Sequence, residues 1–185
     1  MKFSQPLGLI SDAAEVMDRA NRLLNKSQET VTQIDLQNAF RDFSRVLDAK
    51  RQQNPAPTAK ELARLYQKLM STSVQLSHGL KLKPTERIAH MKDAENFAKL
   101  ALQEAERSGN NDRLAQMRFY LAYVKGREVS LRIAAQQREQ PDRALVAEQD
   151  SALEAVGLAL ATLRSISNLD MTVYDAMAKE FMTTA

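Results

Sequence analysis

Residues 112–138 read DRLAQMRFYLAYVKGREVSLRIAAQQR, and their apolar side chains recur at the period of an α-helix. At about 100° of rotation per residue, these side chains form two separate arcs. The first arc holds Leu114, Met117, Leu121, Val124 and Leu131. The second holds Ala115, Phe119, Ala122, Gly126, Val129 and Ile133. A surface helix of a small bundle needs only one apolar stripe, so two arcs predict a helix buried between two neighbours, as in stacked helical hairpins.

The rest of the chain is also typical of an all-α protein. Its 185 residues include 5 glycines and 5 prolines, many alanines and almost no alternating runs of β-branched residues. A chain of this length can bury a stable core without metal ions or disulfides. We therefore expect one all-helical domain over residues 1–185, with the Pro-rich link at 54–58 as a candidate subdomain boundary.

Capping and terminating signals divide the chain into about seven helices. Thr58 and Glu61 form a capping box, Pro84 suits a first helical turn, and Gly109 suits the left-handed position that ends a helix. Similar signals elsewhere complete the set of expected helices: Ser11 or Asp12 to Lys26, 29–53, Thr58 to Gly79, 84–108, 112–138, Asp142 to Ser167, and a short helix capped by Asn168 and Asp170.

Small side chains predict where helices approach closely. Ala94, Ala98, Ala101 and Ala105 form a narrow ridge on the 84–108 helix, and we expect the 112–138 helix to pack against it. A glycine inside a helix costs about 1 kcal/mol relative to alanine. The glycines at positions 126 and 157 therefore predict helix crossings too tight for a side chain.

Residues 93–127, DAENFAKLALQEAERSGNNDRLAQMRFYLAYVKGR, carry a pattern of small residues, a turn and a leucine–alanine pair. The positions concerned are Ala94, Ala98, Ala101, Gly109, Asn110, Leu121 and Ala122. This stretch resembles the helix-turn-helix register of tetratricopeptide-like (TPR-like) repeats. The resemblance implies antiparallel helical hairpins stacked as a right-handed superhelix, which recognises a peptide or helix of a partner in a concave surface. An irregular helical bundle is the alternative.

The composition excludes several kinds of chemistry. Without cysteine, the chain has no disulfide framework, zinc-thiolate site or cysteine nucleophile. Glu86, His90 and Asp93 share one sector of a charged helix, a common arrangement that does not predict a metal site. Glycine-rich phosphate loops, nucleophile elbows and His-Glu-x-x-His sequences are also missing. We expect no enzyme activity, no cofactor and no bound metal.

Charge and hydropathy argue against nucleic acid and membrane as partners. The net charge is +3, from 26 basic and 23 acidic side chains, and no run of five like charges occurs. The apolar run at 152–163 is shorter than a membrane span requires, and residues 1–10 lack the pattern of a secretory signal. We expect an intracellular protein, cytoplasmic or nuclear.

A stripe of cations lies between the two apolar arcs of the 112–138 helix. Arg118, Lys125 and Arg132 follow one another at a spacing of seven, where they could meet carboxylates of a partner through charge-assisted hydrogen bonds. The alternative is local pairing with Glu128, which lies one turn from Lys125 and Arg132 and would contribute about 0.2–0.5 kcal/mol per pair.

Two tyrosines lie on the opposite side of the same helix. Tyr120 and Tyr123 share that side with Gln116 and Arg127. If they are exposed, tyrosines beside an arginine are typical of interaction hot spots. The alternative is that both rings pack against a neighbouring helix.

The function that these patterns favour is a non-catalytic adaptor that binds a peptide or helix, possibly acidic, of another protein. A self-associating structural module is an alternative, because Met171, Val173, Met177, Phe181 and Met182 make the last helix amphipathic. A second alternative is a helical enzyme or small-ligand-binding protein with a pocket near Phe97, Phe119 and His90.

Overall fold

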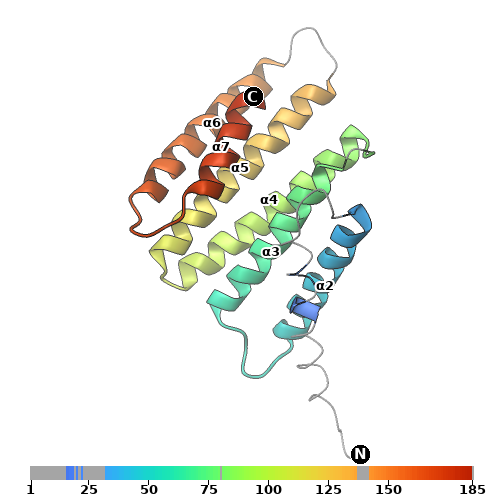
Figure 1. Ribbon diagram of the computed structural model, residues 1–185, viewed down its shortest axis with the longest axis vertical. Helices are drawn as coiled ribbons and strands as arrows, with labels where there is room; N and C mark the ends of the chain where they lie inside the picture. Colours follow the sequence, from blue (N-terminus) through green and yellow to red (C-terminus); the bar gives the residue numbers. More distant parts are fainter. Residues whose placement is uncertain are drawn as a thin grey trace, which may run out of the picture.

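The computed structural model describes residues 16–18, 20, 22, 32–79, 81–136 and 142–184 (Figure 1). The helices are α2 (Gln33–Arg51), α3 (Ala59–Ser77), α4 (Pro84–Arg107), α5 (Asn111–Ala135), α6 (Arg143–Arg164) and α7 (Thr172–Thr184). These ranges contain no strand, which confirms the all-α prediction. Most of the first expected helix, including Ser11, Asp12 and Lys26, lies outside the described residues, as do Arg138 and Pro141.

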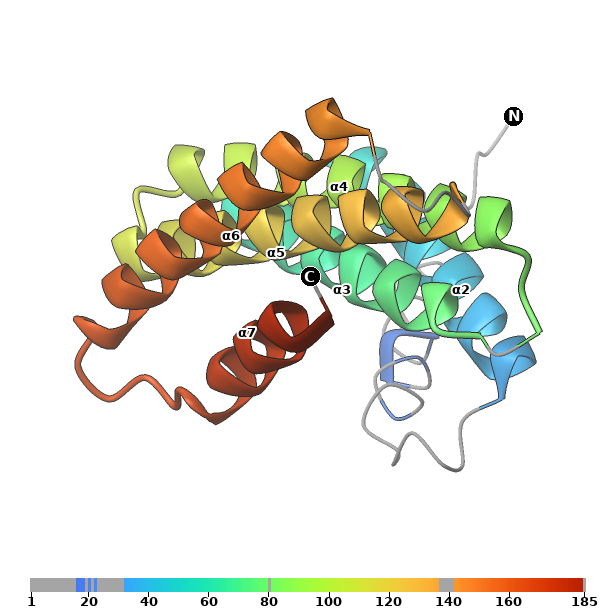
Figure 2. The ribbon, with the colours of Figure 1, turned by 90° about the horizontal axis from the view of Figure 1, so that it is seen from above.

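Helices α2 to α6 pack in chain order, each against the next. Helix α7 departs from this order and contacts both α5 and α6. Figure 2 shows α7 below the row formed by α4, α5 and α6, with its C-terminal end turned toward the middle of the molecule. Helix α5 therefore contacts three of the described helices, α4, α6 and α7.

Capping boxes set the start of α2 and α3. The Thr58 side chain accepts a hydrogen bond from the backbone N–H of Glu61, and Glu61 accepts one from the backbone N–H of Thr58, as predicted. Thr32 and Asp35 form the same reciprocal pair. Because Thr32 is in an extended conformation, α2 begins at Gln33 and not near Glu29.

Both ends of α4 follow their sequence signals. Pro84 lies in the first turn, at the N-terminal end of the helix. Gly109 has a φ of 65°, which a glycine adopts without steric cost. The side chain of Asn110 then caps α5 by accepting a hydrogen bond of 2.8 Å from the backbone N–H of Arg113.

Helix α6 is shorter than expected. It ends at Arg164 and not at Ser167, because Ser165 takes the C-cap position and Asn168 adopts a positive φ of 63°. Asp170 then accepts a hydrogen bond of 2.9 Å from the backbone N–H of Thr172, at the first residue of α7. The chain thus reverses direction between Ser165 and Met171 and lays α7 against α5 and α6.

The core consists of two clusters that meet at the alanine ridge of α4. Ala94 and Ala98 belong to a cluster with residues of α5, α6 and α7, whereas Ala101 and Ala105 belong to a cluster with residues of α2 and α3. All four alanines are fully buried. Met117 of α5 joins the second cluster, so α5 does pack against the ridge, as expected. The small side chains let α4 contact α3 on one side and α5 on the other.

Both apolar arcs of α5 are covered. Each of their members is buried or partly buried, which confirms the prediction of a helix enclosed on two sides. The structure adds α7, which packs against Phe119 and Gly126 of the second arc and against the tyrosine side of α5.

Candidate helix-binding surface

Helix α7 presents a narrow apolar face to α5. Tyr174, Ala178 and Phe181 follow one another at spacings of four and three, so they lie on one side of the helix. All three are buried, whereas Val173 and Met182 on the flanks are 56% and 52% exposed. Phe181 was predicted to lie on an amphipathic face and Tyr174 was not, although the spacing of these three residues indicates one apolar side of the helix.

Aromatic rings contact one another between α7 and α5. The ring of Tyr174 lies edge-on to Phe119 at 5.3 Å between centroids, and 5.7 Å from Tyr120. The ring of Phe181 lies edge-on to Tyr123 at 6.3 Å. Edge-to-face pairs of this kind contribute about 0.5–1.5 kcal/mol each beyond the burial of their surface. These contacts fix the position of α7 along α5 at two points, one near each end.

A glycine provides the space for Phe181. A Cβ atom placed on Gly126 would lie 2.7 Å from Cε1 of the Phe181 ring, closer than atoms in proteins pack. The predicted close crossing at Gly126 is therefore confirmed. The same prediction for Gly157 is wrong, because a Cβ atom there would have no neighbour within 4 Å.

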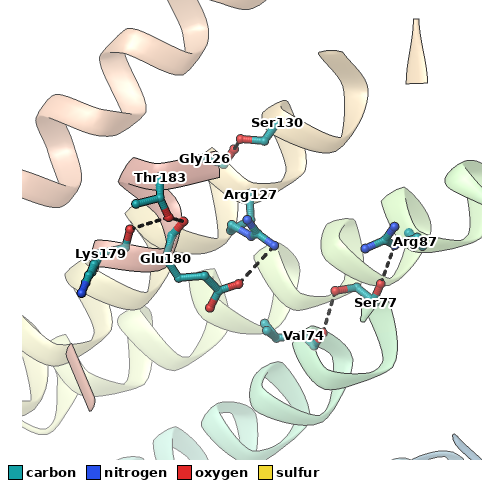
Figure 3. A network of polar contacts seen from close by, with 9 residues as sticks. All are labelled: Val74, Ser77, Arg87, Gly126, Arg127, Ser130, Lys179, Glu180 and Thr183. Carbon is teal, nitrogen blue, oxygen red and sulfur yellow. Dashed lines mark hydrogen bonds and ion pairs between the residues drawn. The ribbon is translucent and has the colours of Figure 1, made fainter. Parts of the chain in front are cut away.

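Ion pairs flank the apolar contact. At the C-terminal end of α7, Arg127 of α5 lies 3.3 Å from a carboxylate oxygen of Glu180 (Figure 3). The Arg127 side chain is only 13% exposed, so this pair is partly shielded from water. At the other end, Arg164 of α6 donates a hydrogen bond of 2.8 Å to Asp175, in an exposed pair. The sequence analysis did not single out either acidic residue of α7.

Tyr123 links the aromatic and charged parts of this surface. Burial, followed by the charge of Glu180, raises the pKa of Tyr123 to about 12. The hydroxyl therefore keeps its proton at neutral pH, and it shares a hydrogen bond with the Glu180 carboxylate. One acidic side chain of α7 thus contacts both Arg127 and Tyr123 of α5.

The structure distinguishes between the two interpretations of the tyrosine pair. Tyr123 is 2% exposed and Tyr120 is partly buried. Both rings pack against residues of α7, so the alternative of packing on a neighbouring helix is confirmed. The expectation of an exposed pair is wrong, because α7 covers that side of α5.

The cationic stripe is only partly open. Arg118 and Lys125 are exposed, and no ion pair involves them within the part of the chain that the structure describes. Arg132 instead lies 3.5 Å from Glu128 and 3.2 Å from Glu148 of α6. Local pairing therefore holds for Arg132, whereas Arg118 and Lys125 face solvent on the side of α5 opposite Tyr123.

A cavity of about 430 Å³ lies between the start of α5 and the end of α6, and its lining is Asn111, Asp112, Ala115, Thr162, Ser165, Ile166 and Ser167. It does not include Phe97, Phe119 or His90, where a small-ligand pocket was considered. Within the described ranges, no group of three or more metal-ligating side chains occurs. None of the described helices has the length and apolar character of a membrane span.

Comparison with known proteins adds no relative: no family model, curated protein or solved structure matches the chain.

Proposed function

We propose that this protein is a non-catalytic interaction module that binds a helical segment of a partner protein on the α5 surface. The observation that supports the proposal most is the seating of α7, because the chain's own amphipathic helix fits this surface through aromatic anchors, a glycine slot and an ion pair. Recognition of helices by such grooves depends on anchors spaced along one helical face. A partner helix would take the place of α7.

The chemistry of the surface defines the partner. Phe119, Tyr120 and Tyr123 favour aromatic side chains seven residues apart, and the slot above Gly126 favours a flat ring at the second position. Arg127 favours an acidic residue next to that ring, as Glu180 is next to Phe181. We therefore propose a partner helix with the pattern aromatic-x-x-x-small-x-acidic-aromatic.

We also propose a TPR-like right-handed superhelix as the arrangement of the helices. The resemblance of residues 93–127 to that repeat and the packing of α2 to α6 in chain order support this arrangement. In such a stack, α3 and α5 would be helices that line the inner face, and the partner helix would bind there in place of α7.

Affinity capture with three forms of the full chain tests the function. Phe181→Ala removes the ring that packs on Gly126 and so weakens the attachment of α7 to α5. The freed α5 surface should then capture more of a true partner from a cell extract. Adding Arg127→Glu to Phe181→Ala should abolish that capture. A synthetic peptide from the captured protein should then bind the Phe181→Ala form and become helical by circular dichroism. Identical sets of captured proteins from all three forms would reject the α5 surface as the binding site.

The exposed pair of Arg118 and Lys125 is a second candidate surface for an acidic partner. It lies on the other side of α5, so a partner bound there would not displace α7. Reversing both charges in the same capture experiment distinguishes the two surfaces, because it should affect only binding to the stripe.

Self-association is a second candidate function, supported by the exposure of Val173 and Met182 on α7. Exposed apolar side chains that form one patch often mark an interface, and a symmetric dimer covers such a patch in both copies. Light scattering across a wide range of protein concentration tests this, because a constant monomer mass would exclude it.

A further inference from the structure

Helix α7 is joined to α6 by a largely exposed link. The link comprises the seven residues 165–171, and Figure 2 shows it looping outward from the end of α6 before α7 begins. Four of its side chains are exposed: Ser165, Ser167, Asn168 and Asp170. Seven residues of extended chain span up to about 24 Å, roughly twice the diameter of a helix with its side chains. A straightened link is therefore long enough to carry α7 to a neighbouring copy.

The folded-back link contains one strained backbone position. Asn168 has a φ of 63°, in the left-handed region that residues with a Cβ atom rarely adopt. Three apolar side chains of the link oppose its straightening, because they pack against the core: Ile166, Leu169 and Met171. The folded-back link is therefore favoured in dilute solution, and the strain at Asn168 offsets part of that preference.

The contacts of α7 do not depend on which copy supplies the helix. Two ring pairs, a glycine slot and two ion pairs join α7 to α5 and α6: Tyr174–Phe119, Phe181–Tyr123, Phe181–Gly126, Glu180–Arg127 and Asp175–Arg164. In each pair, one residue belongs to α7 and the other to the helices that precede the link. If two copies exchange α7, every one of these pairs forms again between the copies.

The helix that fits the α5 surface is encoded in the chain itself. Helix α7 carries the pattern aromatic-x-x-x-small-x-acidic-aromatic as Tyr174, Ala178, Glu180 and Phe181. Each copy in a solution of the pure protein thus supplies one binding surface and one matching helix. Two copies that exchange α7 around a twofold axis fill both surfaces and leave no helix unbound. A second copy is therefore the partner whose chemistry the structure describes in full.

We propose that the α5 surface accepts α7 of a second copy, so that two copies exchange their last helices and form a symmetric dimer. This inference rests on the proposed function, because it needs the α5 surface to bind a helix from another molecule. It differs from association through Val173 and Met182, in which α7 stays on its own chain. Association costs translational and rotational freedom, so the fraction of dimer should rise with protein concentration.

Two variants with complementary defects test the exchange. Phe181→Ala removes the ring and keeps the slot, whereas Gly126→Ala closes the slot and keeps the ring. Only a mixed dimer places an intact ring in an intact slot, through exchange. After the two variants are mixed in mild urea and returned to buffer, native mass spectrometry should show the mixed dimer at least fivefold more abundant than both homodimers together. Random mixing, or monomers alone at every concentration, would overturn the proposal.

A second test uses one exposed position and changes no packed side chain. Glycine adopts a positive φ without strain, so Asn168→Gly should lower the fraction of dimer several-fold in sedimentation experiments at equal concentration. Valine is strongly disfavoured there, so Asn168→Val should raise that fraction. Ser167→Ala, at the preceding exposed position, is the control and should change it little. Equal fractions in the wild type and all three variants would overturn the exchange.

Capture from a cell extract separates this inference from the proposed function. If all forms stay monomeric and Phe181→Ala still captures a foreign partner through Arg127, the exchange is overturned and the proposed function is supported. If the mixed dimer forms and no foreign partner is captured, the exchange is supported and the foreign partner is rejected.

Discussion

The ring of Phe181 fills the space that a side chain at Gly126 would occupy, with Cε2 of the ring 3.0 Å and Cε1 2.7 Å from the position of a Cβ atom. Because Gly126 has no side chain, α7 can pack closely against α5 at this point. Since this close contact joins one residue of each helix, its effect can be measured by single substitutions.

Gly126→Ala should destabilise the protein by about 1–3 kcal/mol, the usual cost of overpacking a well-filled site. Gly157→Ala is the matched control, because a Cβ atom there meets nothing and alanine favours the helix by about 0.5–1 kcal/mol. Urea denaturation followed by circular dichroism measures both changes. If both substitutions changed the free energy of unfolding in the same direction, the close packing of Phe181 on Gly126 would be contradicted.

Phe181→Ala should release α7 while leaving the rest of the fold intact. Loss of a buried phenylalanine costs about 3–5 kcal/mol, and here the loss is local because the main contacts of α7 among the described helices are with α5 and α6. Hydrogen exchange should speed up over residues 172–184 and stay slow in α3 and α4. Met182→Ala, at a position 52% exposed, is the control and should change little. Faster exchange throughout the chain would show that α7 is an integral part of the core.

The start of α3 should lose stability in acid. Hydrogen bonds from Thr58 and the pairing with Lys50 lower the pKa of Glu61 from 4.5 to about 2. The folded state therefore favours the charged carboxylate, and this contribution is complete above pH 4.5 and lost as the pH falls toward 2. Unfolding free energies at pH 6 and 3 should differ less in Glu61→Gln than in the wild type. An unchanged difference would exclude this role of Glu61.

Charge reversal at Arg118 and Lys125 should abolish capture of a partner that binds the cationic stripe, without loss of helicity. Both side chains are exposed, so the substitutions disturb no packing. Arg41→Glu with Arg45→Glu reverses a similar exposed pair on α2 and serves as the control. Capture that survives reversal at 118 and 125, or that the α2 variant also abolishes, would reject the stripe as the binding surface.

Local signals in the sequence predicted much of the fold. The Thr58–Glu61 capping box, the turn at Gly109 and the two arcs of α5 depend on residues within a few turns of one another. Such patterns are set by helix geometry and backbone hydrogen bonds, which a sequence displays directly. The end of α6 was harder to predict. The helix ends at Arg164, although the apolar pattern continues to Ile166 and the left-handed residue, Asn168, comes later in the chain.

The surface against which α7 packs could not be predicted in the same way. The spacing of Tyr174, Ala178 and Phe181 indicates an apolar face, yet it does not say which surface will receive that face. Gly126 and Gly157 gave the same signal, and only the position of Phe181 separates them.

The enclosure of α5 has a consequence for its mutational tolerance. From Leu114 to Ile133, the exposed positions are 118 and 125 alone. In a saturation library of this helix, we expect polar, charged and apolar substitutions other than proline to survive at these two sites, seven residues apart, and few to survive between them. Selection for folding alone would therefore permit variation at two positions seven residues apart and conserve the residues around them.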